Sequence, residues 1–436
     1  MSHHRRPPAE PRLAGTYAWY VMLLLLLCQT LSSLDGKLPF ILVEALKRDL
    51  SLSDTQIGVI TGPAFSLTYA IFALPIARLS DRRARKYVIA GAILIWSLFT
   101  AAGAFATGFA TFAVSRVGVA LGEAALLPAA HSLVAAYMPV RVRPRAMAMI
   151  AIGVALGGYA ALAAGGWIND NYGWRSGLRL VGLAGAVLAA LVVVTMKEPK
   201  REIDDVRHDL PSGNIRSLLA NPGVRNILIG GALLGLTSSA FASWGPAYVI
   251  RSYHLSTTQV GVSFGLVTGV VSIIGIISGG FLNSLVKSKG FAGSLRLLAI
   301  ALVVSTLLQC VSLLTDNYVL FLALTGVTVL LLGLYFAPTF AAVQSLVNPN
   351  ARSFAAAGAL FAINGIGMAS GAFLVGFLSD TLAPHFGKNA LRLALLIAIL
   401  PRLWSAFHYA RAASAIRKTA QHNSASSVGP LNEQLS

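Results

Sequence analysis

Long apolar stretches alternate with short polar ones along almost the whole chain. Each apolar stretch has about 20 residues, the length that a helix needs to cross the hydrocarbon core of a bilayer. Only helices and closed barrels satisfy their backbone hydrogen bonds in lipid, so the pattern predicts an all-α membrane protein. We expect twelve spanning helices, which cover residues 17–38, 56–79, 87–106, 109–138, 146–168, 178–196, 227–250, 260–286, 295–314, 319–343, 354–377 and 391–410.

The longest polar segment lies between the sixth and seventh predicted spans and is rich in charged residues, Pro and Gly. Such a composition is typical of a linker, so we expect two six-helix bundles joined by it. Both ends of the chain are polar and are expected to be disordered tails. The predicted organisation is a tail at 1–15, a first bundle at 16–196, a linker at 197–225, a second bundle at 226–412 and a tail at 413–436.

The composition agrees with a membrane protein, because 56% of the 436 residues are hydrophobic and only 11% are charged. A net charge of +18 could indicate a nucleic-acid partner. Lys and Arg, however, are three times as frequent in the polar segments on the side of the termini as in those on the opposite side. Lys37 is counted with the opposite side. This bias predicts that both termini are cytoplasmic, in a plasma membrane or bacterial inner membrane, and that nucleic acid is not a partner.

Several chemistries find no support in the sequence. The two cysteines, Cys28 and Cys310, lie inside apolar stretches and show no disulfide or metal-ligand spacing. No nucleotide-binding loop and no catalytic-triad spacing is visible. The N-terminal apolar stretch is too long for the core of a signal peptide. We therefore expect no cofactor, no metal and no enzymatic activity.

An internal repeat links the second, fifth, eighth and eleventh spans. Each ends in a small residue followed four positions later by Asp or Asn, in the pairs Ala77/Asp81, Gly166/Asp170, Gly279/Asn283 and Gly376/Asp380. The same spans carry glycine pairs, Gly58/Gly62, Gly153/Gly157, Gly275/Gly279 and Gly367/Gly371. Such pairs let helix backbones approach closely in lipid. The recurrence indicates four three-helix units, and hence two pseudo-symmetric bundles with these spans at their interface.

The fourth span carries two charges, Arg116 and Glu123. Seven residues are nearly two helical turns, so both side chains share a face, about 10 Å apart. Asp35 lies near the outer end of the first span. Arg116 stays protonated and can pair fully with one carboxylate at a time, and the unpaired carboxylate can take a proton near neutral pH. The trio is either a proton-coupling switch or a static salt bridge that braces two helices.

The loop after the second span reads Ala77-Arg78-Leu79-Ser80-Asp81-Arg82-Arg83-Ala84-Arg85-Lys86. It resembles the G-x-x-x-D-R-x-x-R-R/K loop of the major facilitator superfamily, with Ala in the first position, and the whole chain resembles that superfamily. Residues 35–180 resemble its Spinster-like members, through Ser53-Asp54-Thr55-Gln56-Ile57-Gly58, Tyr69, Pro75, Gly122-Glu123-Ala124, Pro128 and Gly173-Trp174-Arg175.

This resemblance implies the major facilitator fold, with the first and fourth spans facing a central cavity. It also implies alternating access and proton-linked or facilitated movement of amphiphiles such as lysolipids. Asp81 and its neighbours would form a gate that stabilises the outward-open state, with the gating residues Ala77, Asp81, Arg82, Arg85 and Lys86. Alternatively, the basic residues of this loop only anchor it in the cytoplasm. Candidates for lining the cavity are Tyr69, His131, Trp244, Tyr248, Tyr335 and Asn364.

The favoured function is a monomeric secondary transporter of an amphiphilic anion or lysolipid, coupled to protons through Asp35, Arg116 and Glu123. A small organic-anion symporter and a multidrug exporter of the same fold are alternatives. A membrane sensor or scaffold that transports nothing is an alternative of another class. The short tails disfavour it, because no soluble domain is attached.

The gating hypothesis gives a first prediction. Asp81→Ala should lower the rate of transport without abolishing substrate binding, because the variant loses a contact that stabilises one conformation but leaves the cavity intact. Initial rates and equilibrium binding, measured side by side, check this. An unchanged rate would leave only the anchoring role for the loop.

Overall fold

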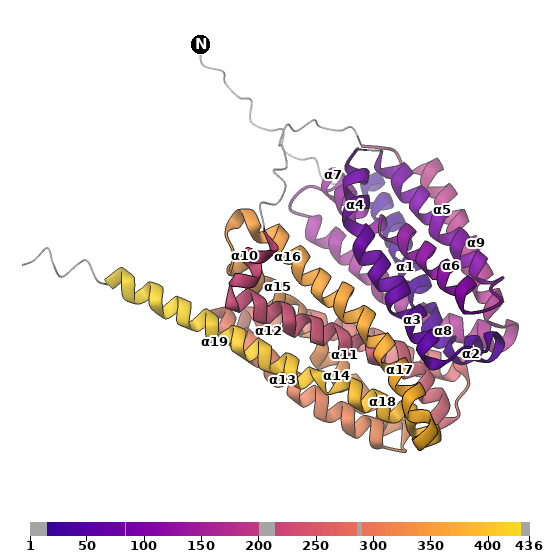
Figure 1. Ribbon diagram of the computed structural model, residues 1–436. Helices are drawn as coiled ribbons and strands as arrows, with labels where there is room; N and C mark the ends of the chain where they lie inside the picture. The colour runs from indigo at the N-terminus through magenta and orange to yellow at the C-terminus, as the bar shows by residue number, and fades with distance from the viewer. Residues whose placement is uncertain (1–14, 83, 200–213, 286–289, 429–436) are drawn as a thin grey trace, which may run out of the picture.

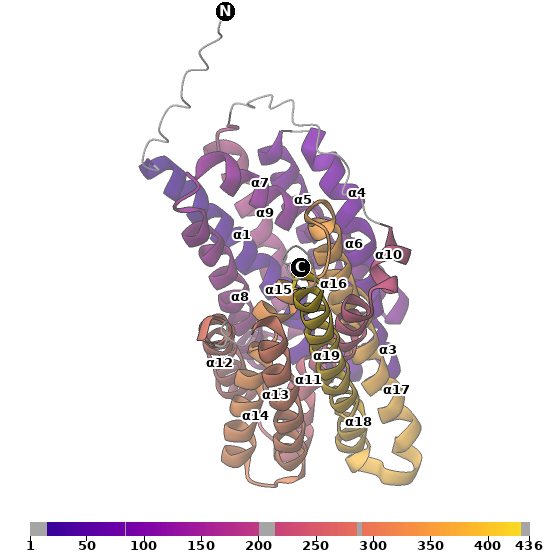
Figure 2. The same ribbon diagram turned by 90° about the vertical axis from the view of Figure 1, so that its left-hand side faces the viewer.

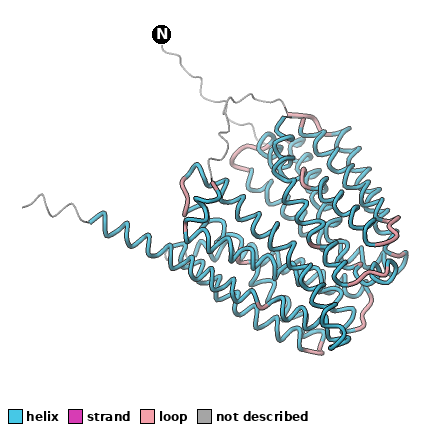
Figure 3. Tube along the Cα trace, viewed as in Figure 1, coloured by secondary structure: helices cyan, strands magenta, loops and turns pink. Residues whose placement is uncertain are grey.

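The computed structural model describes residues 15–82, 84–199, 214–285 and 290–428, with their side chains except at 74, 77–82, 282–285 and 419–428. All regular structure in these ranges is helical, and they contain no strand (Figure 3). By length and composition, eleven helical stretches within them could cross a membrane. The last of these, Pro349–Lys418, turns back on itself at Gly387–Asn389 and so contains two passages, which gives the twelve predicted spans.

The first half forms one group of helices, coloured indigo to magenta in Figure 1. Its elements are α1 (Thr16–Ile41), α2 (Val43–Leu50), α3 (Asp54–Thr61), the π-helical η1 (Pro63–Leu67), α4 (Thr68–Arg82), α5 (Arg85–Gly103), α6 (Phe109–Glu123), α7 (Leu126–Tyr137), α8 (Arg143–Tyr172) and α9 (Trp174–Thr195). The short helix α2 was not predicted. It follows α1 after a single residue and buries Val43, Ala45, Leu46 and Leu50.

The second half forms the other group. Its elements are α10 (Ile215–Ala220), α11 (Pro222–Tyr253), α12 (Thr257–Leu285), α13 (Gly290–Leu314), α14 (Tyr318–Gly333), α15 (Phe336–Ser345), η3 (Pro349–Ala351), α16 (Arg352–Leu360), the π-helical η4 (Phe361–Gly367), α17 (Met368–Phe386), η5 (Gly387–Asn389), α18 (Ala390–Ile399) and α19 (Pro401–Val428). The bundle boundaries at 196 and 226 stay predictions, since 200–213 lie outside the described residues.

The C-terminal tail predicted from 413 is wrong over most of its length, because α19 continues to Val428. Residues 412–421 explain the difference, since they consist largely of Ala, Arg, Lys and Gln, which are strong helix formers. The lack of an apolar pattern marks the end of the membrane passage but does not end the helix.

The fourth and tenth passages are broken at equivalent places. The fourth breaks between α6 and α7, just after Glu123, and the tenth between α14 and α15, just after Gly333. Pro128 and Pro338 lie five residues after these helix ends. A proline has no N–H for the carbonyl four residues earlier, so it weakens the helix at that point. The two breaks therefore support the predicted internal symmetry.

The two bundles meet along the four spans that carry the repeat, with α3 against α17 and α8 against α12 (Figures 1 and 2). A Cβ at Gly166 would lie 2.3 Å from the carbonyl oxygen of Thr257, and one at Gly376 would lie 2.2 Å from that of Asp54. These glycines of the Gly-x-x-x-Asp pattern are therefore required for close approach across the interface.

The glycine pairs also make close backbone contacts, but mostly inside one bundle. Only Gly58/Gly62 packs across the interface, against α17. Gly153/Gly157 packs on α1, Gly275/Gly279 on α14 and Gly367/Gly371 on α11. The prediction of close helix packing is thus confirmed, while most of these pairs hold a single bundle together.

Gly376 gives a test of the interface. Gly376→Ala should destabilise the protein by about 1–3 kcal/mol, because the new methyl group would overlap the backbone of Asp54. Thermal unfolding in detergent measures the effect. Gly280→Ala is the matched control in α12, where a Cβ would meet nothing within 4 Å, and it should be neutral or slightly stabilising. Equal melting temperatures for both variants would contradict the packing argument.

Candidate functional site

One end of the interface, where α2 lies, holds the hydrogen bonds and ion pairs that the structure describes between the bundles. We call it the α2 end. There, Asp380 of α17 accepts hydrogen bonds from the backbone N–H groups of Asp54 (3.1 Å) and Thr55 (2.7 Å). Asp170 of α8 accepts from the backbone of Thr258 (2.7 Å) and from the hydroxyl of Thr257 (2.5 Å). Each carboxylate thus caps a helix of the opposite bundle, where the helix dipole favours negative charge.

The two capped helices begin with nearly the same sequence, which was not recognised from the repeat of helix ends. Leu52 to Val59 reads LSDTQIGV and Leu255 to Val262 reads LSTTQVGV. In each, the serine accepts from the backbone of the glutamine three residues on, and the glutamine side chain accepts from the serine backbone, which is a capping box. A search for repeated helix starts, instead of repeated helix ends, would have found this pair.

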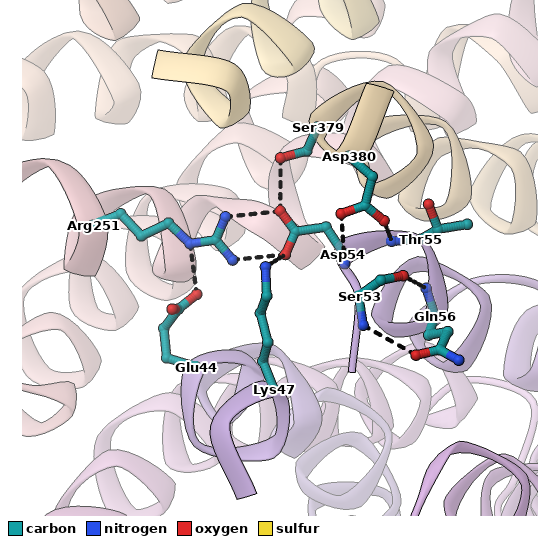
Figure 4. Close-up of polar contacts among 9 residues, drawn as sticks. All are labelled: Glu44, Lys47, Ser53, Asp54, Thr55, Gln56, Arg251, Ser379 and Asp380. Atoms are coloured by element: carbon teal, nitrogen blue, oxygen red, sulfur yellow. Dashed lines mark hydrogen bonds and ion pairs between the residues drawn. The ribbon is translucent and has the colours of Figure 1, made fainter. Parts of the chain in front are cut away.

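The repeats differ at two positions: Ile57 is matched by Val260, a conservative change, and Asp54 by Thr257, which removes a charge. Asp54 is the centre of an ion-pair network across the interface (Figure 4). Arg251 of α11 donates to both of its carboxylate oxygens, at 2.8 and 2.9 Å, and also to Glu44 at 2.8 Å. Lys47 donates at 2.5 Å and Ser379 at 2.6 Å. Bidentate pairing of this kind is geometrically specific, so the network fixes α2 and α3 against α11 and α17.

Next to this network, α2 is tied to its own bundle. Asp49 accepts from the indole of Trp174 at 2.9 Å and pairs with Arg48 and Arg175. Partial burial would raise the pKa of Asp49, but the Trp174 hydrogen bond and the two guanidinium groups outweigh it and hold that pKa below its ordinary value. Asp49 therefore stays ionised and keeps α2 in place on α9.

The three intramembrane charges of the sequence analysis lie together inside the first bundle. Asp35, Arg116 and Glu123 have exposed fractions of only 0%, 2% and 5%. Arg116 pairs with Asp35 at 3.0 Å, and Asp35 also accepts from the hydroxyl of Thr100. Glu123 has no cation within salt-bridge distance among the described residues and accepts from Ser32 at 2.8 Å. Its other oxygen, Oε1, is buried without a hydrogen-bond partner.

A cavity of about 300 Å³ lies between the bundles. It is lined from the first bundle by α1 and α8 and from the second by α11, α12, α13 and α14. Asp35, Arg116 and Glu123 are not part of this lining. They lie on α1 and α6 inside the first bundle, where Arg116 pairs with Asp35. The charged residue that does line the cavity is Lys37, which the sequence analysis had counted with an outer loop.

The other residues predicted to line the cavity lie in different surroundings. Tyr335 lines the cavity as predicted. Trp244 and Tyr248 do not; they are buried in the core and donate to the carbonyls of Ala372 and Leu313. Their positions in an apolar helix gave no sign of which face they occupy. Tyr69 is half-buried and stacks on Phe65, whereas His131 and Asn364 are exposed.

The gating loop is described only in part. The side chains of Ala77, Asp81 and Arg82 lie outside the described residues. The backbone N–H groups of Arg85 and Lys86 both donate at 3.0 Å to the carboxylate of Glu198. The sequence analysis placed Glu198 in the linker. It did not predict that Glu198 caps α5, because Glu198 lies far from Arg85 and Lys86 in the sequence. The described residues contain no group of His, Cys, Asp or Glu that could hold a metal ion.

Two helical bundles that meet through a pseudo-symmetric interface, with a cavity between them and charges inside the membrane passages, define a multi-pass membrane transporter of the alternating-access class. The sequence profile of the Major Facilitator Superfamily matches residues 25–357. The chain belongs to this family.

The chain is similar to several named relatives and to a solved structure. An "MFS-type efflux pump" of Mycolicibacterium smegmatis is 33% identical over 88% of this chain and 89% of its own. "Protein spinster" of Drosophila melanogaster is 24% identical over 89% of this chain and 67% of its own. A solved structure of a bacterial homologue of the human lysosomal transporter Spinster, in an inward-facing and unoccupied conformation, superposes with a TM-score of 0.83 at 22% identity and covers 93% of this chain and 98% of its own.

The Asp54 network gives a test of how the α2 end closes. Asp54→Asn should weaken the pairing with Arg251 and increase several-fold the fraction of molecules in which this end is open. Spin labels at Tyr172→Cys and Lys388→Cys, on opposite bundles, would report the distance in lipid, with Cys28 and Cys310 changed to alanine. Asp316→Asn, which removes a highly exposed partner of Arg392, is the control and should leave the distances unchanged. Identical distributions for both variants would show that the network does not hold the end closed.

Proposed function

We propose that this protein is a proton-coupled carrier of an amphiphilic anion, in which Asp35, Arg116 and Glu123 are the coupling element. One observation carries the proposal: Arg116 is paired with Asp35, while Glu123 is buried nearby without a cation. An unpaired buried carboxylate is costly when ionised, and a proton removes that cost. A guanidinium near two buried acids can pair with either of them. The site therefore has two arrangements with the same number of charges, which differ in which carboxylate is paired.

Coupling follows from an exchange of partners. When Glu123 holds a proton, Arg116 stays with Asp35, which is the arrangement described here. Loss of that proton creates a second carboxylate that competes for the same guanidinium. Arg116 can satisfy only one of them fully, so the deprotonation changes how α6 packs against α1. Since α6 breaks directly after Glu123, this helix end is free to respond.

The sidedness comes from the charge distribution along the chain. With both termini in the cytoplasm, the α2 end faces outward and is closed by the Asp54, Asp170 and Asp380 contacts. The protein is then in an inward-facing conformation in the inner membrane of a bacterium, and we propose that it works as a monomer. An amphiphilic substrate is what the resemblance to Spinster-like members implies, and "Protein spinster" is among the relatives. Relatives that include a "Probable galactarate/D-glucarate transporter" of Bacillus subtilis keep a small organic acid as the second candidate.

Uptake into liposomes that contain the purified protein tests the proposal. A labelled lysophospholipid should move faster when a pH gradient is imposed. Glu123→Gln should abolish this stimulation but leave exchange without a gradient, because the glutamine mimics the protonated acid permanently. Asp316→Asn, at an exposed site, should behave like the unchanged protein.

Three other outcomes would each overturn a part of the proposal. Transport that is indifferent to the gradient would leave a facilitator with a static Asp35–Arg116 brace. Movement of glucarate but not of the lysophospholipid would replace the amphiphile with a small organic acid. Loss of folded protein in Glu123→Gln would favour the static brace over the switch.

A further inference from the structure

Lys37 is a cation in the middle of the molecule that the coupling element does not use. It lies on α1, lines the cavity between the bundles, and makes no ion pair or hydrogen bond with any described residue. An ionisable group inside a membrane passage is costly, so an unpartnered one indicates a partner that comes and goes. The structure describes no acidic side chain in the lining of this cavity.

The neighbouring helix makes room for the side chain of Lys37. A Cβ at Gly158 of α8 would lie 2.7 Å from the Lys37 amine and 3.3 Å from its Cδ. The extended side chain therefore lies against a glycine, and any larger residue would push the amine aside. On the opposite wall, Gln309 of α13 lines the same cavity, and neither its amide nitrogen nor its oxygen has a hydrogen-bond partner.

The rest of the lining is mostly apolar and comes from both bundles, including Phe40, Phe241, Phe264, Ile276 and Leu332. Two of its hydroxyl groups are already in use, because Thr268 and Ser272 donate to carbonyls of their own helix at 2.7 Å. The cavity thus offers the amine of Lys37, the amide of Gln309 and the hydroxyls of Ser238 and Tyr335, set in a mostly apolar wall. A polyhydroxylated acid has more polar groups than these four can pair, and each one left without a partner carries a cost.

We propose that Lys37 is the binding residue for the anionic head of the substrate, with Gln309 as its polar neighbour, and that the apolar wall holds a single alkyl chain. The substrate class is then a single-chain amphiphile with one anionic head. This inference rests on the proposed carrier function but concerns binding alone. It holds whether or not transport is coupled to protons.

Binding measured without any gradient tests it. Isothermal titration on the protein in lipid nanodiscs would use three probes: octyl phosphate, octanol and glucarate. The unchanged protein should bind octyl phosphate more tightly than glucarate. Lys37→Gln should weaken octyl phosphate at least about tenfold, because a desolvated charge pair is lost, and should leave octanol unchanged. Lys37→Arg, which keeps the charge, should stay within about threefold of the unchanged protein.

The controls separate charge from fold. Lys388→Gln removes an exposed lysine in η5 and should bind all three probes normally. Gly158→Ala keeps the charge of Lys37 but displaces its amine, so it should weaken octyl phosphate selectively and serves as the test if Lys37→Gln does not fold. Adding Lys37→Gln to Glu123→Gln should again weaken octyl phosphate, so the role of Lys37 can be tested even in a protein that no longer couples to protons.

Two results would overturn the inference. Unchanged octyl phosphate affinity in both Lys37→Gln and Gly158→Ala would show that Lys37 does not hold the head group. Tighter binding of glucarate than of octyl phosphate, with loss in Lys37→Gln, would show that the cavity recognises a hydrophilic acid and that no alkyl chain is needed.

Discussion

Every charge inside the membrane passages must find a partner or lose its charge, and this constraint organises the molecule. Asp35 and Arg116 satisfy each other within the first bundle. Glu123 accepts a hydrogen bond from the hydroxyl of Ser32 but has no ion pair among the described residues. Lys37 lines the cavity between the bundles and likewise has no ion pair among those residues. Arg402, in the second bundle, is fully buried with long hydrogen bonds of 3.5 and 3.4 Å to Thr237 and Ser305. The role of each charged group therefore depends on how far the ion pairs and hydrogen bonds from its neighbours offset the cost of burying its charge.

The α2 end uses the same constraint for closure. The carboxylates of Asp170 and Asp380 cap helix N-termini of the opposite bundle, so these contacts are lost when the bundles separate. The two halves of this contact are unequal. On the α3 side, Asp54 brings in Arg251 and Lys47, whereas on the α12 side the equivalent Thr257 offers a hydroxyl to Asp170. Opening this end must therefore break the ion pairs of Arg251 on α11 with Asp54 and Glu44, but only hydrogen bonds between α8 and α12.

The sequence predicted the fold well, because lipid imposes a pattern that can be read locally. Span length, the linker and the glycine repeat all depend on near neighbours in the chain. It also predicted that Asp35, Arg116 and Glu123 lie close together. What it missed depends on helix rotation and long-range contact: the inward face of Lys37, the core positions of Trp244 and Tyr248, and the cap that Glu198 provides for α5. In helices that are apolar on every side, hydropathy alone does not distinguish a cavity face from a packed face.

The helix α1 carries both halves of the proposed mechanism. Asp35 and Lys37 are two residues apart, which is about 200° around a helix, so one faces the coupling element and the other the cavity. With Asp35, Arg116, Glu123 and Lys37 all ionised, the four charges sum to zero. A proton on Glu123 alone leaves an excess positive charge, and an anion at Lys37 alone leaves an excess negative one.

The four side chains and the bound anion have no net charge in only two states. In one, Glu123 is deprotonated and no anion is bound; in the other, Glu123 is protonated and the anion is bound. In a low-dielectric interior the charged states are the costly ones, so proton and anion each favour the binding of the other. Reciprocal binding of this sign couples the two in the same direction across the membrane. Under the proposed mechanism, the arrangement of charges on α1 and α6 therefore favours symport of a proton with the anion over an exchange of one for the other.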